Sequence, residues 1–80
     1  MALIENMEKK ENKYHNIIAE NIKKLRQKAK ISQEKMAEKL NCSREFISRV
    51  ENCKERISLN MLLKISELFK VNPSSLFKES

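Results

Sequence analysis

The stretch NCSREFISRVEN, residues 41–52, sets a serine ahead of a run in which apolar residues recur with the spacing of a helix. On a wheel of 100° per residue, Phe46, Ile47 and Val50 occupy one arc of about 100°. Five polar residues fall within a separate arc of about 140°. The apolar arc can anchor such a helix to a core, which leaves the polar arc free for another use. The polar residues are Arg44, Glu45, Ser48, Arg49 and Asn52.

The serine of this stretch, Ser43, is one of three that precede an expected helix in the same way, the others being Ser32 and Ser58. Each serine can accept a hydrogen bond from a backbone amide of the first turn. The residue before it can pack on the fourth helical position as a hydrophobic staple. Proline fits the first position of a helix, so a further short helix is expected after Asn72-Pro73. The staple pairs are Ile31 with Met36, Cys42 with Ile47, and Ile57 with Leu62.

Upstream of these starts, an apolar stripe at intervals of four, three and four residues predicts an amphipathic helix through Ile18, Ile22, Leu25 and Ala29. Only Asn41 and Cys42 separate the second expected helix from the third, and so short a connection forces the sharp bend of a helix-turn-helix. We therefore expect an all-α fold, a compact five-helix domain over residues 15–80. Residues 1–14 would form an arm or an extension of the first helix. The expected helices cover about residues 15–29, 32–40, 43–52, 58–70 and 73–78.

Charge favours a polyanionic partner without requiring one. The chain has 17 Lys and Arg against 11 Asp and Glu, a formal net charge of +6. Eleven of the basic and six of the acidic residues lie between residues 20 and 56, so the surplus gathers around the opening stretch. A basic zone on a small domain is typical of proteins that bind nucleic acid, although a solvated surface explains the charge equally well. No apolar run is long enough to span a membrane, so we expect a cytoplasmic protein with no membrane partner.

Chemistry other than binding finds little support in the sequence. Two cysteines, Cys42 and Cys53, and one histidine, His15, are too few ligands for a zinc site, and we expect both thiols to be reduced. The chain has no glycine and therefore no glycine-rich phosphate loop, and no pair of acids on an apolar pocket wall is recognisable. We expect no catalytic activity, no metal, no cofactor and no small-molecule ligand.

Three segments, SQEKMAEKL (32–40), SREFISRVEN (43–52) and ISLNMLLKISELFKVNPSSLF (57–77), resemble the second to fifth helices of lambda-repressor-like (XRE-type) helix-turn-helix domains. The resemblance implies a transcriptional regulator, for example a repressor, that binds double-stranded DNA sequence-specifically as a homodimer at a near-palindromic operator. Two narrower roles stay open, the controller protein of a restriction-modification system and the DNA-binding antitoxin of a toxin pair. The family commonly has glycine where this chain has Asn41 and Cys53.

By position, the resemblance also implies a role for each polar residue around the third helix. Arginine can donate two parallel hydrogen bonds to guanine and glutamate can accept from cytosine N4, so these roles agree with the wheel. A partly buried ion pair between Arg26 and Glu51 is implied between the first and third helices. The residues implied to read bases are Ser43, Arg44, Glu45, Ser48 and Arg49, and those implied to contact phosphates are Gln33, Asn52, Lys54 and Arg56.

The fourth helix has more apolar residues than one core face needs. Leu59, Leu62 and Phe69 can serve the interior. A second stripe would then be exposed, and an exposed apolar patch usually signals an interface. We expect a homodimer joined through this stripe, unless the fifth helix folds back and covers it within one chain. The stripe holds Met61, Ile65 and Leu68, extended by Leu76 or Phe77.

Overall fold

The computed structural model describes the backbone of residues 2–79 and the side chains of residues 13–79. Within that part the chain forms four α-helices and one 3₁₀ helix, with no strand. The predicted all-α fold is confirmed, with the 3₁₀ helix in the place of the fifth helix. The elements are α1 (Ala2–Lys28), α2 (Gln33–Leu40), α3 (Arg44–Glu51), α4 (Leu59–Leu68) and η1 (Pro73–Phe77). Because α1 begins at Ala2, residues 2–14 continue the first helix.

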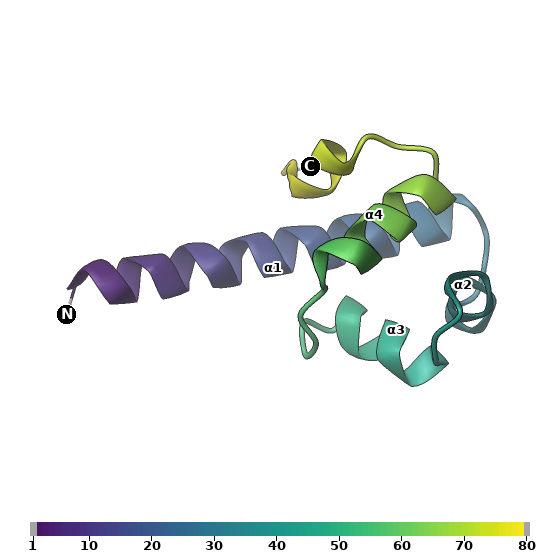
Figure 1. The fold of residues 1–80 in the computed structure, drawn as a ribbon, viewed down its shortest axis with the longest axis horizontal. Coiled ribbons are helices and arrows are strands. Elements are labelled where there is room, and N and C mark those ends of the chain that lie inside the picture. The colour runs from purple at the N-terminus through teal and green to yellow at the C-terminus, as the bar shows by residue number, and fades with distance from the viewer. Residues whose placement is uncertain (1, 80) are drawn as a thin grey trace.

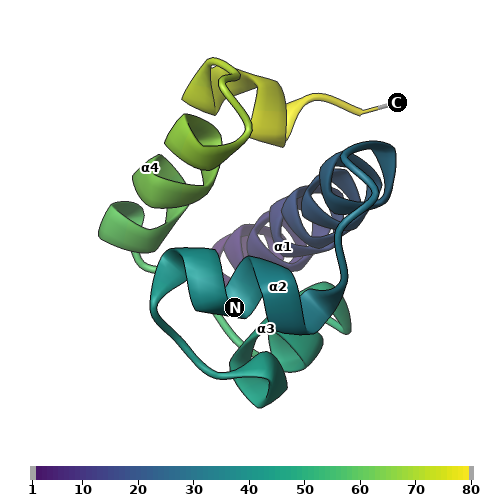
Figure 2. The same ribbon diagram turned by 90° about the vertical axis from the view of Figure 1, so that its right-hand side faces the viewer.

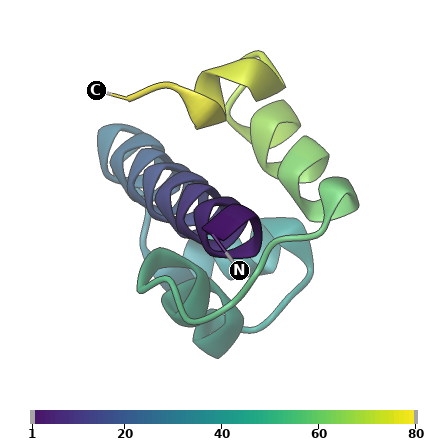
Figure 3. The ribbon, with the colours of Figure 1, turned by 90° about the vertical axis from the view of Figure 1, so that its left-hand side faces the viewer.

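α1 is the axis about which the other elements are arranged. α2 and α3 lie below it in Figures 1 and 3, whereas α4 and η1 lie beside and above it. Figure 2, seen from the opposite end, shows α2 and α3 crossing each other below α1. The N-terminal half of α1 extends past all the other elements in Figure 1, which accounts for a long axis of 43 Å against 24 and 20 Å for the other two.

One side chain from each of the five elements meets in a single core. These five side chains have no exposed surface, and they belong to one cluster of buried residues. Burying an aliphatic side chain of this size contributes about 1.5–3 kcal/mol, so the core depends on all five elements together. The five are Ile22 of α1, Met36 of α2, Ile47 of α3, Ile65 of α4 and Leu76 of η1.

The three helix starts predicted at serines are confirmed. The hydroxyl oxygen of each serine accepts a hydrogen bond from the amide three residues on, at 2.9 Å for Ser32, 3.0 Å for Ser43 and 3.1 Å for Ser58. At η1 the side-chain oxygen of Asn72 accepts from the amide of Ser74 at 3.0 Å. The residues before the serines are half-buried and pack against the core, as the staple requires: Ile31, Cys42 and Ile57.

The four α-helices also share one kind of ending. Just after each helix, one residue adopts the left-handed backbone conformation, and its amide donates a hydrogen bond to the carbonyl three residues earlier. The next amide bonds to the carbonyl five residues back, which completes a Schellman motif. Because α1 stops at Lys28, Ala29 lies beyond the apolar stripe and is exposed, contrary to the prediction. The left-handed residues are Lys30 (φ 59°), Asn41 (φ 57°), Cys53 (φ 62°) and Lys70 (φ 55°).

The apolar faces of α4 differ from the predicted ones. Leu59 is 70% exposed, since it lies one turn before the buried Leu62 and beyond the edge of the core. Ile65 and Leu76, expected at the dimer interface, have no exposed surface. Ile65 is on the core-facing side of α4, and η1 folds back against α1 and brings Leu76 into the same core. Both residues are therefore removed from the interface.

A polar contact fixes the return of η1 to α1. The side-chain amide of Asn21 donates to the backbone carbonyls of Leu76 and Lys78, each at 2.8 Å. These residues are more than fifty positions apart in the sequence, so the bonds close the fold from one end to the other. The sequence analysis left open that the last helix folds back and covers apolar surface within one chain. The structure shows this in part, because Leu76 of η1 is buried in the core.

Candidate nucleic-acid interface

α3 is held against the domain by its inner face and by the turn that precedes it. Ile47 and Val50 are buried, and Phe46 is half-buried against the same core. The left-handed Asn41 reverses the chain after α2, and the amide of Cys42 then bonds to the carbonyl of Ala37 at 2.9 Å. The two helices of the predicted helix-turn-helix therefore form one packed unit.

The outer face of α3 carries the charged residues that the wheel placed there. Arg44, Glu45 and Arg49 are exposed, whereas Ser48 is half-buried. The side-chain amide of Asn52 donates to the backbone carbonyl of Ser48 at 2.9 Å, so Asn52 closes the end of the helix. Of the residues expected to read bases, three thus share an open face, and Ser43 lies at its N-terminal end as the cap.

Behind α3, the structure brings Arg26, Glu51 and Gln33 together in one cluster. Arg26 Nε donates to Glu51 Oε2 at 2.7 Å, and Arg26 Nη2 donates to Glu51 Oε1 at 3.0 Å. Gln33 Nε2 donates to the same Oε1 at 3.1 Å. The side chains of Arg26 and Glu51 are 13% and 2% exposed, and their hydrogen bond raises the pKa of the Arg26 guanidinium. The cluster joins α1, α2 and α3, so it fixes the position of the helix that carries the charged face.

The other residues expected at phosphates lie on the borders of α3. Gln33 begins α2, and its side-chain amide donates a hydrogen bond to Glu51. Lys54 and Arg56 are exposed in the loop between α3 and α4. The left-handed Cys53 turns the chain at the start of this loop, and the amide of Lys54 bonds to the carbonyl of Arg49 at 2.8 Å. The chain takes this turn without the glycine that the family commonly has there.

The sequence analysis did not anticipate one residue that contacts the outer face of α3. Glu55, in the same loop, accepts a hydrogen bond from Arg49 Nε at 3.0 Å. On its other side, the Arg49 guanidinium carbon lies 5.9 Å from the centre of the Phe46 ring. Arg49 and Glu55 are six residues apart, and no helical spacing links them. Only their opposite charges gave a signal.

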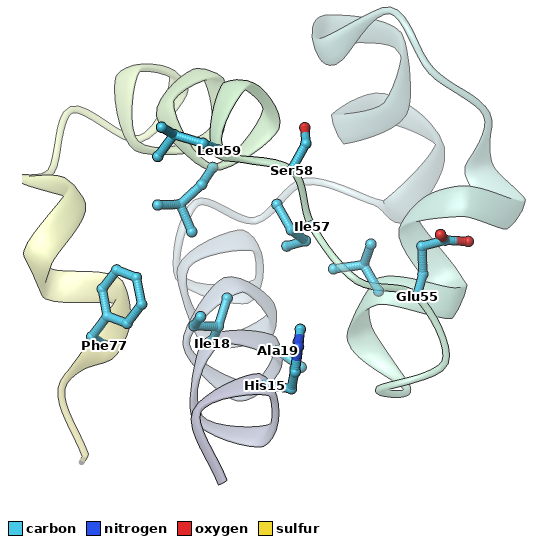
Figure 4. A pocket seen from close by; sticks show the side chains of 10 residues that line it. His15, Ile18, Ala19, Glu55, Ile57, Ser58, Leu59 and Phe77 are labelled. Carbon is cyan, nitrogen blue, oxygen red and sulfur yellow. The ribbon is translucent and has the colours of Figure 1, made fainter. Parts of the chain in front are cut away.

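A largely apolar groove of about 260 Å³ lies between α1, the loop before α4, and η1, with Val50 of α3 also in its lining. Figure 4 shows Ile18, Ile57, Leu59 and Phe77 around it. Among residues 13–79, no group of three His, Cys, Asp or Glu side chains is arranged to hold a metal. No helix in the described part of the chain is long and apolar enough to cross a membrane. Both thiols are free, and burial raises the pKa of the Cys42 thiol.

Comparison with known proteins gives the same picture of the fold. The family described as helix-turn-helix matches residues 22–76, which is more than half of the chain. A similar solved structure is that of the restriction-modification controller protein C.AhdI from Aeromonas hydrophila, with a TM-score of 0.73 and 25% sequence identity. The similarity covers 79% of this chain and 91% of that one. No curated protein matches the sequence. From this match and the helix-turn-helix geometry, the chain belongs to the XRE-type helix-turn-helix family of DNA-binding transcription regulators.

Proposed function

We propose that this regulator binds a near-palindromic site on double-stranded DNA as a homodimer, with α3 in the major groove. The observation that carries the proposal is the open face of α3, where Arg44, Glu45 and Arg49 are exposed while the opposite face is anchored in the core. An α-helix fits the major groove, where arginine can bond to guanine O6 and N7 and glutamate can accept from cytosine N4. We assign base reading to these three residues, with Ser43 and Ser48 beside them.

Phosphate contacts would come from the residues that border α3. Gln33, Asn52, Lys54 and Arg56 lie at the start of α2, at the end of α3 and in the loop that follows. Contacts to the sugar-phosphate backbone position a protein on the duplex without specifying its sequence. The net charge of +6 supports such contacts with any duplex.

For the homodimer, we propose an interface on one flank of α4. Leu59 and Leu63 are adjacent on the helix and are 70% and 44% exposed. Phe77 of η1 is 43% exposed and lines the same groove as Leu59 (Figure 4). Met61 and Leu68 lie about 160° around the helix from this flank and are half-buried against the core. We therefore leave Met61 and Leu68 out of the proposed interface, although the sequence analysis expected them there.

Two substitutions test the division between base and phosphate contacts. The preferred site is first selected from a random duplex pool, and affinities are then measured by fluorescence anisotropy. Arg49→Ala should cost about 1–3 kcal/mol on the preferred site and relax the choice at one base pair. Lys54→Ala should weaken all sequences alike and lower the slope of log affinity against log salt by about 1. An equal loss on preferred and random DNA for Arg49→Ala would reject its role.

A narrower role as a restriction-modification controller is favoured by one observation, the similarity to C.AhdI over most of both chains. If this chain acts in that way, its selected site should lie in front of genes for a DNA methyltransferase and an endonuclease. A reporter driven by that DNA should then respond to the level of the protein. A selected site with no such genes beside it would leave the general role as a regulator and remove the narrower one.

A further inference from the structure

We propose that Glu55 is a positioning residue for DNA recognition, which holds the Arg49 side chain ready for a guanine and lowers the affinity for other DNA. The proposal rests on the base-reading role of Arg49 proposed above. It assigns selectivity to a loop carboxylate that would make no contact with a base.

The loop geometry places Glu55 beside Arg49. Cys53 turns the chain back at the end of α3, and the amide of Lys54 bonds to the carbonyl of Arg49 at 2.8 Å. Glu55 Oε1 then accepts from Arg49 Nε at 3.0 Å. The pair is partly exposed, at 48% for the Arg49 side chain and 35% for that of Glu55. An ion pair this open to water contributes little to the stability of the fold, so its main effect is on the conformation of the two side chains.

The atoms used in this pair leave the other end of the guanidinium for DNA. Arginine has many rotamers, and fixing one of them before binding reduces the entropy lost on association. Glu55 holds Nε, and the Phe46 ring lies 5.9 Å from the guanidinium carbon. Within residues 13–79, Nη1 and Nη2 of Arg49 have no hydrogen-bond partner. These two nitrogens can donate in parallel to O6 and N7 of one guanine.

The charge of Glu55 also lowers the affinity of the protein for DNA of any sequence. A carboxylate beside α3 repels the phosphates of every duplex, whatever its sequence. This repulsion lowers the affinity for specific and non-specific DNA by a similar factor. Holding the Arg49 side chain favours only a site whose guanine accepts both Arg49 hydrogen bonds, so it is this second effect that raises the ratio of specific to non-specific affinity.

Glu55→Gln tests this role, because it keeps the shape of the side chain and removes its charge. Glu67→Gln is the control for removing a carboxylate, since Glu67 is exposed and forms no ion pair within the described residues. Affinities are measured by fluorescence anisotropy for three duplexes: the selected site, that site with the guanine read by Arg49 replaced, and random DNA. The same measurements are made on Arg49→Ala and on the double variant, and thermal melts check that each variant is folded.

We expect Glu55→Gln to bind random DNA more tightly and to lose about 3- to 10-fold of the preference for the guanine, a coupling of the size found between contacting residues. In the Arg49→Ala background the same change should leave that preference unaltered. Glu67→Gln should not alter the preference. If Arg49→Ala loses the preference but Glu55→Gln tightens all three duplexes equally, Glu55 only repels DNA and the positioning role is overturned while the proposed function stands. If Arg49→Ala keeps the preference, both proposals fail.

Discussion

Among single residues, Glu51 is the one whose truncation we expect the domain to tolerate least. Its side chain is 2% exposed and accepts hydrogen bonds from both Arg26 and Gln33. Glu51→Ala would leave the largely buried Arg26 guanidinium without its partner. We expect a loss of about 3–5 kcal/mol in the free energy of unfolding, measured with urea. Glu38→Ala, which removes an exposed pair with Lys35, should cost about 0–1 kcal/mol.

The pH dependence of this contribution follows from Arg26. The hydrogen bond with Glu51 raises the pKa of Arg26 in the folded state, so the contribution is fully present below the ordinary pKa of an arginine side chain. It is lost only as the pH rises through the still higher folded pKa. If the free energy of unfolding of Glu51→Ala lies within about 1 kcal/mol of the wild-type value, the range of an exposed ion pair, the pair between Arg26 and Glu51 is dispensable.

At the level of whole elements, the ends of the helices are strained and open to improvement. Residues other than glycine lose about 1–2 kcal/mol in the left-handed conformation, which Cys53 adopts at φ 62°. Cys53→Gly removes this strain. Glycine also loses more conformational entropy on folding, which offsets about 0.5–1 kcal/mol of the gain. We expect a net gain of about 0.5–1 kcal/mol in urea unfolding. Asn41→Gly should gain less, because asparagine tolerates this conformation, and a destabilised Cys53→Gly would contradict the reasoning.

The starts of α2, α3 and α4 have a direct signal in the sequence, whereas the ends of the helices are predicted less exactly, apart from that of α2 at Leu40. A serine cap is a local signal, and Ser32, Ser43 and Ser58 all act as caps. The ends have no such signal because the chain has no glycine, so the sequence predicts a fourth helix that continues to residue 70, although α4 stops at Leu68. Local pattern also fails for Leu59, because only the packed core decides where a buried stripe stops.

On the outer face of α3, too, some features can be predicted from the sequence and others cannot. The outer residues of α3 follow from its helical period, so the sequence alone places Arg44 and Arg49 on one face. The contact between Arg49 and Glu55 depends on how the loop after α3 turns back, and that turn is set by the backbone of Cys53. Periodicity carries no information about such a turn.

At the scale of the whole molecule, the dimer proposal makes a prediction about mass. If Leu59, Leu63 and Phe77 are covered by a second copy, sedimentation equilibrium at micromolar concentration should give a dimer. Leu63→Glu should shift it toward the monomer, because a charge would then be buried in an apolar contact. Asn60→Glu, on the polar outer side of α4, is the control and should keep the dimer mass.

A monomer that Leu63→Glu leaves unchanged would defeat the proposal. A two-fold dimer would set two copies of α3 about 34 Å apart, which is one turn of DNA. The selected site should then consist of two inverted half-sites at that spacing. A single half-site in the selected sequences would count against a dimer on DNA, even if one forms in solution.

The core, to which each element gives at least one fully buried side chain, also decides how the molecule opens. An element that leaves the domain takes a buried side chain out of the shared cluster, so we expect local openings of single helices to be rare. In hydrogen exchange, the slowest amides of all four α-helices should report the same free energy of opening. Calorimetric and van 't Hoff enthalpies should also agree, as they do for a single cooperative unit. If the slowest amides of different helices report different free energies of opening, at least one helix unfolds independently of the rest.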